Sequence, residues 1–436
     1  MSLSQEVTKT SSLKSSPEVG EARQREGLSS IGKAWCLTLF VAEEIPATIV
    51  IYVALLMFLQ MGMALAEATF FSALLFLPWA LKSFIRSLVE HVMHPRLLLH
   101  TVEILLCGAL VLLAYCCNKG VLPVFYSLFS VCLLCSIHSL ASQACYERTI
   151  HPLYRRFLTP PGQMCSQMAI VFTYGAFIFL VGILQVYSRN IRYSWQVGSY
   201  VAAGVFLLFT LFHLAFLTFS NDNSQVEERH CSKKILPSRG NFWRGASLLF
   251  LLLLPQGLMF YARVLYLYDV HSNGGLQCTI QEIGFAQGTV GVIAFSLGLL
   301  LGRRIVRKTT LRGGSNGGGN SFWLMACSLA LSPFVYLLMT IYPPQYLLHL
   351  SFCTGMAQLF FGLGLGACRF PLTDISGTRY NALLNHLRIP PLATVMLLPM
   401  AASGYLVSQL GYTNFFLFNT ICAFFCLLGI FVLRRP

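Results

Sequence analysis

The stretch AWCLTLFVAEEIPATIVIYVALLMFL, residues 34–59, is apolar almost throughout and is long enough to cross a lipid bilayer as one helix. A spanning helix needs about 20 mainly apolar residues, because each residue adds ~1.5 Å and the hydrocarbon layer is ~30 Å thick. Similar stretches follow along the whole chain. The twelve predicted spans are residues 34–59, 64–82, 97–117, 121–146, 164–187, 195–219, 243–268, 280–302, 321–342, 346–371, 380–408 and 412–433.

The composition of the chain agrees with this interpretation. Hydrophobic residues make up 56% of its 436 residues and charged residues only 11%. In soluble globular domains, by contrast, roughly a quarter of the residues are charged. We therefore predict an all-α membrane protein.

The basic residues indicate how the chain is oriented in the membrane. Lys and Arg occur almost entirely in the terminal segments and in every second loop, whereas the other loops hold only Lys119, Arg189 and Arg192. By the positive-inside rule both termini are cytoplasmic, which requires an even number of spans. Topology and anionic lipid also explain the net charge of +14, so we predict no nucleic-acid partner.

Polar segments divide the chain into parts. Residues 1–33 contain no apolar run and predict a disordered cytoplasmic tail. The polar residues 220–242 separate six spans from six. We predict a cytoplasmic linker there, between an N-terminal six-helix lobe at 34–219 and a C-terminal lobe at 243–436. This layout is typical of two-lobed transporters with related halves.

Two carboxylates lie within the first predicted span. An ionised side chain at membrane depth costs at least about 2.5 kcal/mol, so each one is a candidate for function. Glu43 and Glu44 directly precede Ile45 and Pro46, and a proline-loosened helix with acidic residues at the break favours proton coupling. The alternative is that one of them faces a neighbouring Arg or lies near the cytoplasmic third of the membrane.

A basic residue in the seventh span is the second unusual group. We predict Arg263 either as an anion-binding group or as the partner of Glu43 or Glu44. Ordinary packing is the alternative for the aromatic residues around it. The predicted substrate-binding residues are Gln143, Tyr146, Gln256, Tyr261 and Arg263.

Other polar groups predict a cytoplasmic gate. Glu103 is expected to pair with Lys82 or Arg86 across the cytoplasmic mouth, and His138 is expected to be a satisfied interior histidine rather than a proton relay. A short basic loop follows the second span of each half and is a candidate part of this gate. The alternative is that these basic residues only reflect the positive-inside rule. The predicted gating residues are Lys82, Glu90, Glu103, Arg303 and Arg304.

Small residues predict close helix contacts in the second half. Gly298 with Gly302, and Gly362 with Gly364 and Gly366, would allow two backbones to approach closely. We find no catalytic constellation, metal-ligand cluster or phosphate-binding loop in the sequence. We therefore expect no enzymatic activity and no cofactor, and transport driven by gradients.

Several stretches of the chain resemble a known family. They are AEEIP (42–46), LPWALKSFIRSLVE (77–90), GGLQCTIQEIGFAQGTVGVIAFSLGLLLG (274–302) and LLPMAASGYLVSQLGYTNFF (397–416). They are similar to the AmpG-like branch of the major facilitator superfamily, the muropeptide permeases related to acetyl-coenzyme A transporters. The resemblance covers nearly all of residues 34–433.

The resemblance implies the major facilitator fold, with two lobes that rock around a central cavity. It also implies a protein of the bacterial inner membrane that takes up a cell-wall-derived sugar peptide, or a similar amphipathic anion, together with protons. We expect the protein to be a monomer. Ser139, Gln143 and Gln256 stand where we expect carboxylates. These departures leave open a transport-incompetent sensor or assembly partner that retains the fold. A membrane-embedded acyltransferase, with only His138 in its favour, is the third possibility.

Overall fold

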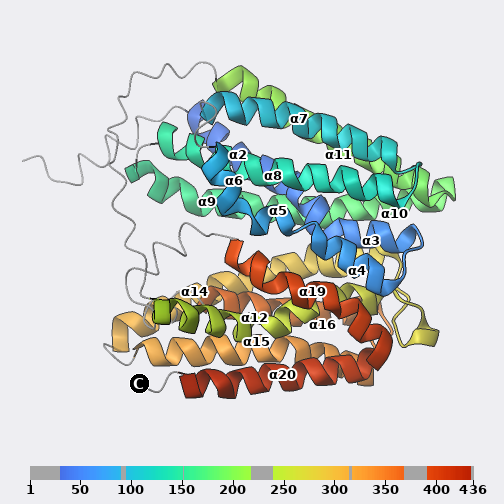
Figure 1. Cartoon of the computed structure of the whole chain (residues 1–436), viewed down its shortest axis with the longest axis vertical. Coiled ribbons are helices and arrows are strands. Elements are labelled where there is room, and N and C mark those ends of the chain that lie inside the picture. The colour runs from blue at the N-terminus through green and yellow to red at the C-terminus, as the bar shows by residue number, and fades with distance from the viewer. Residues whose placement is uncertain are drawn as a thin grey trace, which may run out of the picture.

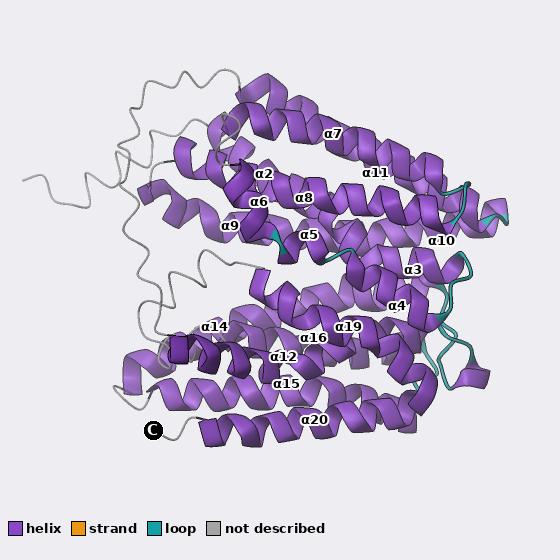
Figure 2. Cartoon of the chain, viewed as in Figure 1, coloured by secondary structure: helices purple, strands orange, loops and turns teal. Residues whose placement is uncertain are grey.

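The computed structural model describes residues 30–89, 95–150, 152–217, 239–313, 317–367 and 390–433. All regular elements in these ranges are helical (Figure 2). Within them, nine helices are long and apolar enough to cross a membrane, and three shorter apolar helices lie at Leu65–Ala80, Val395–Leu410 and Tyr412–Leu427. These helices correspond to the predicted spans.

Twelve consecutive elements form the first half of the described chain. They are α2 (Ser30–Thr48), η1 (Ile49–Val53), α3 (Ala54–Gln60), α4 (Leu65–Leu74), α5 (Leu77–Ala80), α6 (Lys82–Val89), α7 (Pro95–Cys116), α8 (Val121–Thr149), α9 (Pro152–Ile170), η2 (Val171–Ala176), α10 (Phe177–Ser188) and α11 (Ile191–Leu217).

The second half begins with the long helix α12. Its elements are α12 (Arg239–Tyr268), η3 (His271–Asn273), α13 (Ile280–Ile283), η4 (Gly284–Gly291), α14 (Val292–Gly313), α15 (Gly317–Ile341), α16 (Leu347–Ala367), α19 (Pro390–Leu410) and α20 (Tyr412–Leu433).

The long helices lie roughly side by side, with the first half above the second half in the view of Figure 1. We call the end where α2 begins and α20 ends the terminal end, and the end with the 270–279 loop the far end. The proposed linker and tail cannot be described, because residues 218–238 and 1–29 lie outside the described ranges. The division into lobes at 220–242 therefore stays a prediction.

Among the described residues, three spans contain a π-helical segment: η1, η2 and η4. The local sequence favours these departures from the α-helix. Pro46 lies one turn before η1 and removes an N–H donor. Gly175 lies in η2, and Gly284, Gly288 and Gly291 lie in η4, where glycine weakens an α-helix. Such segments occur frequently at functional sites.

Helices α14 and α16 pack with their backbones in direct contact, as predicted from the glycines. A Cβ atom added at Gly298 would lie 2.2 Å from the carbonyl oxygen of Leu359, and one at Gly362 would lie 2.1 Å from that of Phe295. Gly302 and Gly366 make the same kind of approach one turn further along. Close packing of small residues replaces the hydrophobic driving force that helices lack inside lipid.

Similar contacts join the two halves toward the far end. A Cβ atom at Gly404 of α19 would lie 2.4 Å from the carbonyl oxygen of Leu65 in α4. In the same way, a Cβ atom at Gly182 of α10 would lie 2.6 Å from the side chain of Gln281 in α13. Nearer the terminal end, Ser296 of α14 donates a hydrogen bond to Gln167 of α9.

Candidate functional site

The π-helical segments bring aromatic and polar side chains from both halves together around Arg263. The rings of Tyr52 and Tyr174 stack with their centroids 5.0 Å apart. The ring of Phe260 lies 5.6 Å from that of Tyr52 and 4.9 Å from the guanidinium carbon of Arg263. We call the following residues the central cluster: Tyr52, Tyr174, Phe260, Arg263, Gln287 and Tyr336.

Arg263 is a buried cation without a counter-ion in the described part of the chain. Its side chain is only 7% exposed, and its Nε atom has no hydrogen-bond partner there. The contact with Phe260 contributes about 2 kcal/mol when it is desolvated, which is well below the cost of burying a charge. Arg263 therefore has unused capacity to bind a negative group.

Amides and hydroxyls line another part of the central cluster. Gln358 donates a hydrogen bond of 3.2 Å to Gln287, and Gln287 donates one to the hydroxyl of Tyr336. Within the described ranges, the hydroxyl of Tyr174 is buried without a partner. Tyr261, a predicted substrate-binding residue, is adjacent to the cluster, with its ring 5.2 Å from that of Phe260, and its hydroxyl is within hydrogen-bonding reach of Ser72.

Glu43 and Glu44 lie away from Arg263, against α8 and α9. The hydroxyl of Ser142 donates a 3.4 Å hydrogen bond to Glu43, and Ser166 is within hydrogen-bonding reach of Glu44. Both carboxylates are half-buried. Neither forms an ion pair with any residue that the structure describes, so the alternative in which Arg263 is the partner of Glu43 or Glu44 is not present.

Glu103 lies between two histidines rather than beside Lys82 or Arg86. Its Oε1 atom is 2.6 Å from Nδ1 of His213 and 3.3 Å from Nε2 of His138. His138 is therefore a hydrogen-bonded interior histidine, in agreement with its expected role. His213 was not predicted, although an ionisable residue in the apolar sequence of the sixth span is itself a signal.

The remaining predicted binding residues serve contacts within the protein. On α8, Gln143 donates to Glu147 at 2.9 Å, and the hydroxyl of Tyr146 lies 3.2 Å from that of Thr159. These contacts lie nearer the terminal end than the central cluster. A role for either residue in solute binding stays a prediction.

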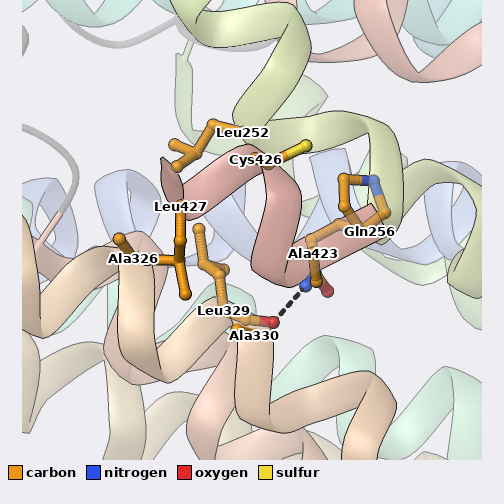
Figure 3. Close-up of a pocket in the computed structure, with 9 residues that line it drawn as sticks. Leu252, Gln256, Ala326, Leu329, Ala330, Ala423, Cys426 and Leu427 are labelled. Atoms are coloured by element: carbon orange, nitrogen blue, oxygen red, sulfur yellow. Dashed lines mark hydrogen bonds between the residues drawn. The ribbon is translucent and has the colours of Figure 1, made fainter. Parts of the chain in front are cut away.

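Gln256 lines a small, mainly apolar pocket among α12, α15 and α20 (Figure 3). Its amide donates a 2.7 Å hydrogen bond to the carbonyl oxygen of Leu329. In a continuous helix this carbonyl would accept from residue 333, but Pro333 has no N–H. Gln256 therefore satisfies a carbonyl that the proline leaves unpaired.

The predicted gating residues are not gathered at one place. Lys82 is buried and donates a 2.6 Å hydrogen bond to Ser139. Arg303 donates a 3.0 Å hydrogen bond to Gln163 across the two halves. Arg304 is exposed to the surroundings, and Glu90 lies outside the described residues. A gating role for these residues stays a prediction.

We compared the chain with known proteins and solved structures. No family model and no curated protein matches the chain. A crystal structure of a POT family transporter in complex with 5-aminolevulinic acid is 13% identical, with a TM-score of 0.68, and the match covers 93% of this chain and 97% of that one.

Two further crystal structures show the same likeness. A bacterial homologue of the human lysosomal transporter Spinster, in an inward-facing and unoccupied conformation, is 12% identical with a TM-score of 0.64, covering 93% of this chain and 98% of that one. The nucleoside transporter NupG is 12% identical with a TM-score of 0.62, covering 94% and 100%.

At identities this low, the likeness shows the fold alone. The AmpG-like branch stays a proposal. The solved structures are of transporters by their own descriptions. The chain has an all-α fold similar to that of these transporter structures, with nine helices long enough to cross a membrane and three shorter apolar helices among the described residues.

Proposed function

We propose that the protein is a secondary active transporter for a small, negatively charged solute. The observation that carries this proposal is the buried and unpaired Arg263. A bound carboxylate or phosphate would supply the missing counter-charge, and the planar guanidinium suits both groups. Aromatic rings from both halves surround the cation, which suits a solute that also carries an apolar or sugar-ring portion.

The packing between the halves supports alternating access. Backbone contacts through Gly404 and close contacts through Gly182 join α4 to α19 and α10 to α13 at the far end. Small residues let helices approach closely and separate again without large side chains standing between their backbones at these positions. A solute at Arg263 would then be reached from alternate ends as the halves rock.

The finer parts of the proposal concern coupling and substrate. Glu43 and Glu44 remain the proposed proton-coupling residues, since both are half-buried carboxylates without an ion pair among the described residues. The proposed substrate is a cell-wall-derived sugar peptide or a similar amphipathic anion. We propose that the transporter works as a monomer in the inner membrane with both termini cytoplasmic.

Ligand-induced thermal stabilisation of the purified protein tests the proposal. A ligand that binds the folded state raises the melting temperature, by a free energy of about 2.7 kcal/mol at a hundred times Kd. We expect stabilisation by sugar-peptide carboxylates, and loss of it in Arg263→Met. Arg192→Met, which changes an exposed arginine, should retain it. Equal stabilisation of the two variants would overturn the assignment of the solute site.

Uptake by sealed proteoliposomes separates a carrier from a sensor that retains the fold. A carrier accumulates solute when a proton gradient is applied, whereas a sensor binds it without accumulation. Glu43→Gln combined with Glu44→Gln should remove the dependence on the gradient while binding at Arg263 persists. Unchanged gradient-driven uptake in the double variant would show that coupling lies elsewhere.

A further inference from the structure

A second set of ionisable groups lies buried within the first half, apart from Arg263. Glu103 of α7 is 0% exposed, as is His213 of α11, and His138 of α8 is 1% exposed. Both imidazoles direct a nitrogen to the same oxygen, Oε1 of Glu103, at 2.6 and 3.3 Å. Nitrogens that converge on a carboxylate oxygen are hydrogen-bond donors to it, which is not the arrangement of ligands around a metal ion.

We propose that Glu103, His138 and His213 form a buried proton-binding site that holds one proton as the imidazolium of His213, paired with the ionised carboxylate of Glu103. With both imidazoles neutral, the ionised Glu103 would be a net negative charge in a site closed to solvent, which costs several kcal/mol. One added proton makes the group electrically neutral overall. The 2.6 Å contact is slightly shorter than the range of about 2.7–2.9 Å for charge-assisted N–H···O hydrogen bonds, which are themselves shorter than neutral ones.

The hydroxyl of Thr38 can accommodate both protonation states of His213. It lies 3.1 Å from Nε2 of His213, and 3.1 and 3.0 Å from the carbonyl oxygens of Ala34 and Trp35. When Nε2 carries no proton, the hydroxyl can donate to it. When Nε2 is protonated, the hydroxyl accepts from it and turns its own hydrogen to a carbonyl. Proton uptake therefore costs no hydrogen bond at this position.

The two carboxylate oxygens of Glu103 lie in different environments. Its Oε2 atom is buried and has no hydrogen-bond partner among the residues that the structure describes. An ionised carboxylate usually accepts bonds at both oxygens, and leaving one unpaired costs about 1–3 kcal/mol or more. A positive charge on His213 would offset part of this cost by stabilising the ionised carboxylate.

Charged groups on the surrounding helices influence this site. His100 and Cys107 of α7 face Glu103, and Arg96 of α7 faces His100. On α6, Lys82 donates a hydrogen bond to Ser139, the residue after His138. The positive charge of Arg96 opposes a further positive charge at the site. Thr38 is partly exposed near the beginning of α2, so protons would exchange from the terminal end.

Nitrogen-15 NMR of the histidine-labelled protein tests the proposal directly. At about pH 8 an unperturbed histidine is almost fully neutral. We expect one imidazolium in the wild-type spectrum at that pH, lost in His213→Asn, whose amide nitrogen can replace Nδ1 as a donor without holding a proton. His349→Asn, which changes an exposed histidine of α16, should leave the signal unchanged.

A variant of Glu103 tests the role of the carboxylate in the proton-binding site. In Glu103→Gln the counter-charge is removed, so His213 should become neutral at the same pH. A wild-type spectrum in which all histidines are neutral would overturn the proposal, and this result does not depend on whether any variant folds. An imidazolium that persists in a folded Glu103→Gln protein would also overturn it. Neither experiment requires a solute, so the proton site and the solute site at Arg263 can fail separately.

Discussion

Replacing Gly362 with alanine should weaken the packing of α14 against α16. The added Cβ atom would lie 2.1 Å from the carbonyl oxygen of Phe295, which is about 1 Å closer than van der Waals contact allows. Because the neighbour is main chain, it cannot rotate away, and the two helices must separate. Overpacking of this kind costs about 1–3 kcal/mol. The better helix propensity of alanine returns up to about 1 kcal/mol, so we expect a net loss of about 1–2 kcal/mol.

Unfolding of the purified protein in detergent, by heat or by denaturant, measures this loss. Gly108→Ala and Gly204→Ala are matched controls, because a Cβ atom at either position meets nothing within 4 Å. These two variants should be as stable as the wild type or slightly more so. The double variant Gly298→Ala with Gly362→Ala should lose less than the sum of its single losses, since both substitutions separate the same helices. A Gly362→Ala protein as stable as the controls would refute backbone contact between α14 and α16.

Three further predictions follow from individual contacts. Gly288→Ala should loosen the packing of η4 against η2, because its Cβ atom would lie 2.5 Å from the carbonyl oxygen of Tyr174. Faster thiol labelling of cysteines introduced at the far end would show this. Gln256→Leu should lower the free energy of unfolding by about 1–3 kcal/mol by leaving the carbonyl of Leu329 unpaired, without loss of ligand-induced stabilisation. Burial, together with the charge of Glu282, raises the pKa of the Cys278 thiol to about 12. Alkylation of this thiol near pH 8 should therefore be about a thousand-fold slower than that of an exposed thiol, and its rate should rise about tenfold per pH unit. Peptide mass spectrometry measures the extent of alkylation.

The spans could be predicted from the sequence because only length and apolar character decide whether a helix crosses a bilayer. The glycine contact of α14 with α16 was predicted for a similar reason, since four-residue spacing places small residues on one face of a helix. The π-helical segments could not be predicted. The choice between i+4 and i+5 hydrogen bonds is decided by packing with other spans, of which a single sequence gives no direct record.

The candidate site was predicted in part. Arg263 was identified because a basic residue within an apolar span is rare. The partner of Glu103 was not, because an uncertainty of one residue in a helix boundary rotates a side chain by about 100°, and His213 is 110 positions away in the chain. Pro333 indicates an unpaired carbonyl in the sequence, but only the tertiary fold shows that Gln256 reaches it.

The π-helical segment η1 has a consequence for how this chain tolerates changes in length. A π turn accommodates about one surplus residue relative to an α-helix, which shifts the helical phase by about 100°. Glu44 and Leu55 are thus held on faces that an uninterrupted α-helix would not give them. Deleting a single residue between them need not break the span, because η1 can revert to α-helix and absorb the gap. The rotation that η1 introduces between Glu44 and Leu55 would be lost instead. A deletion here would therefore reorient one part of the span relative to the other without unfolding it.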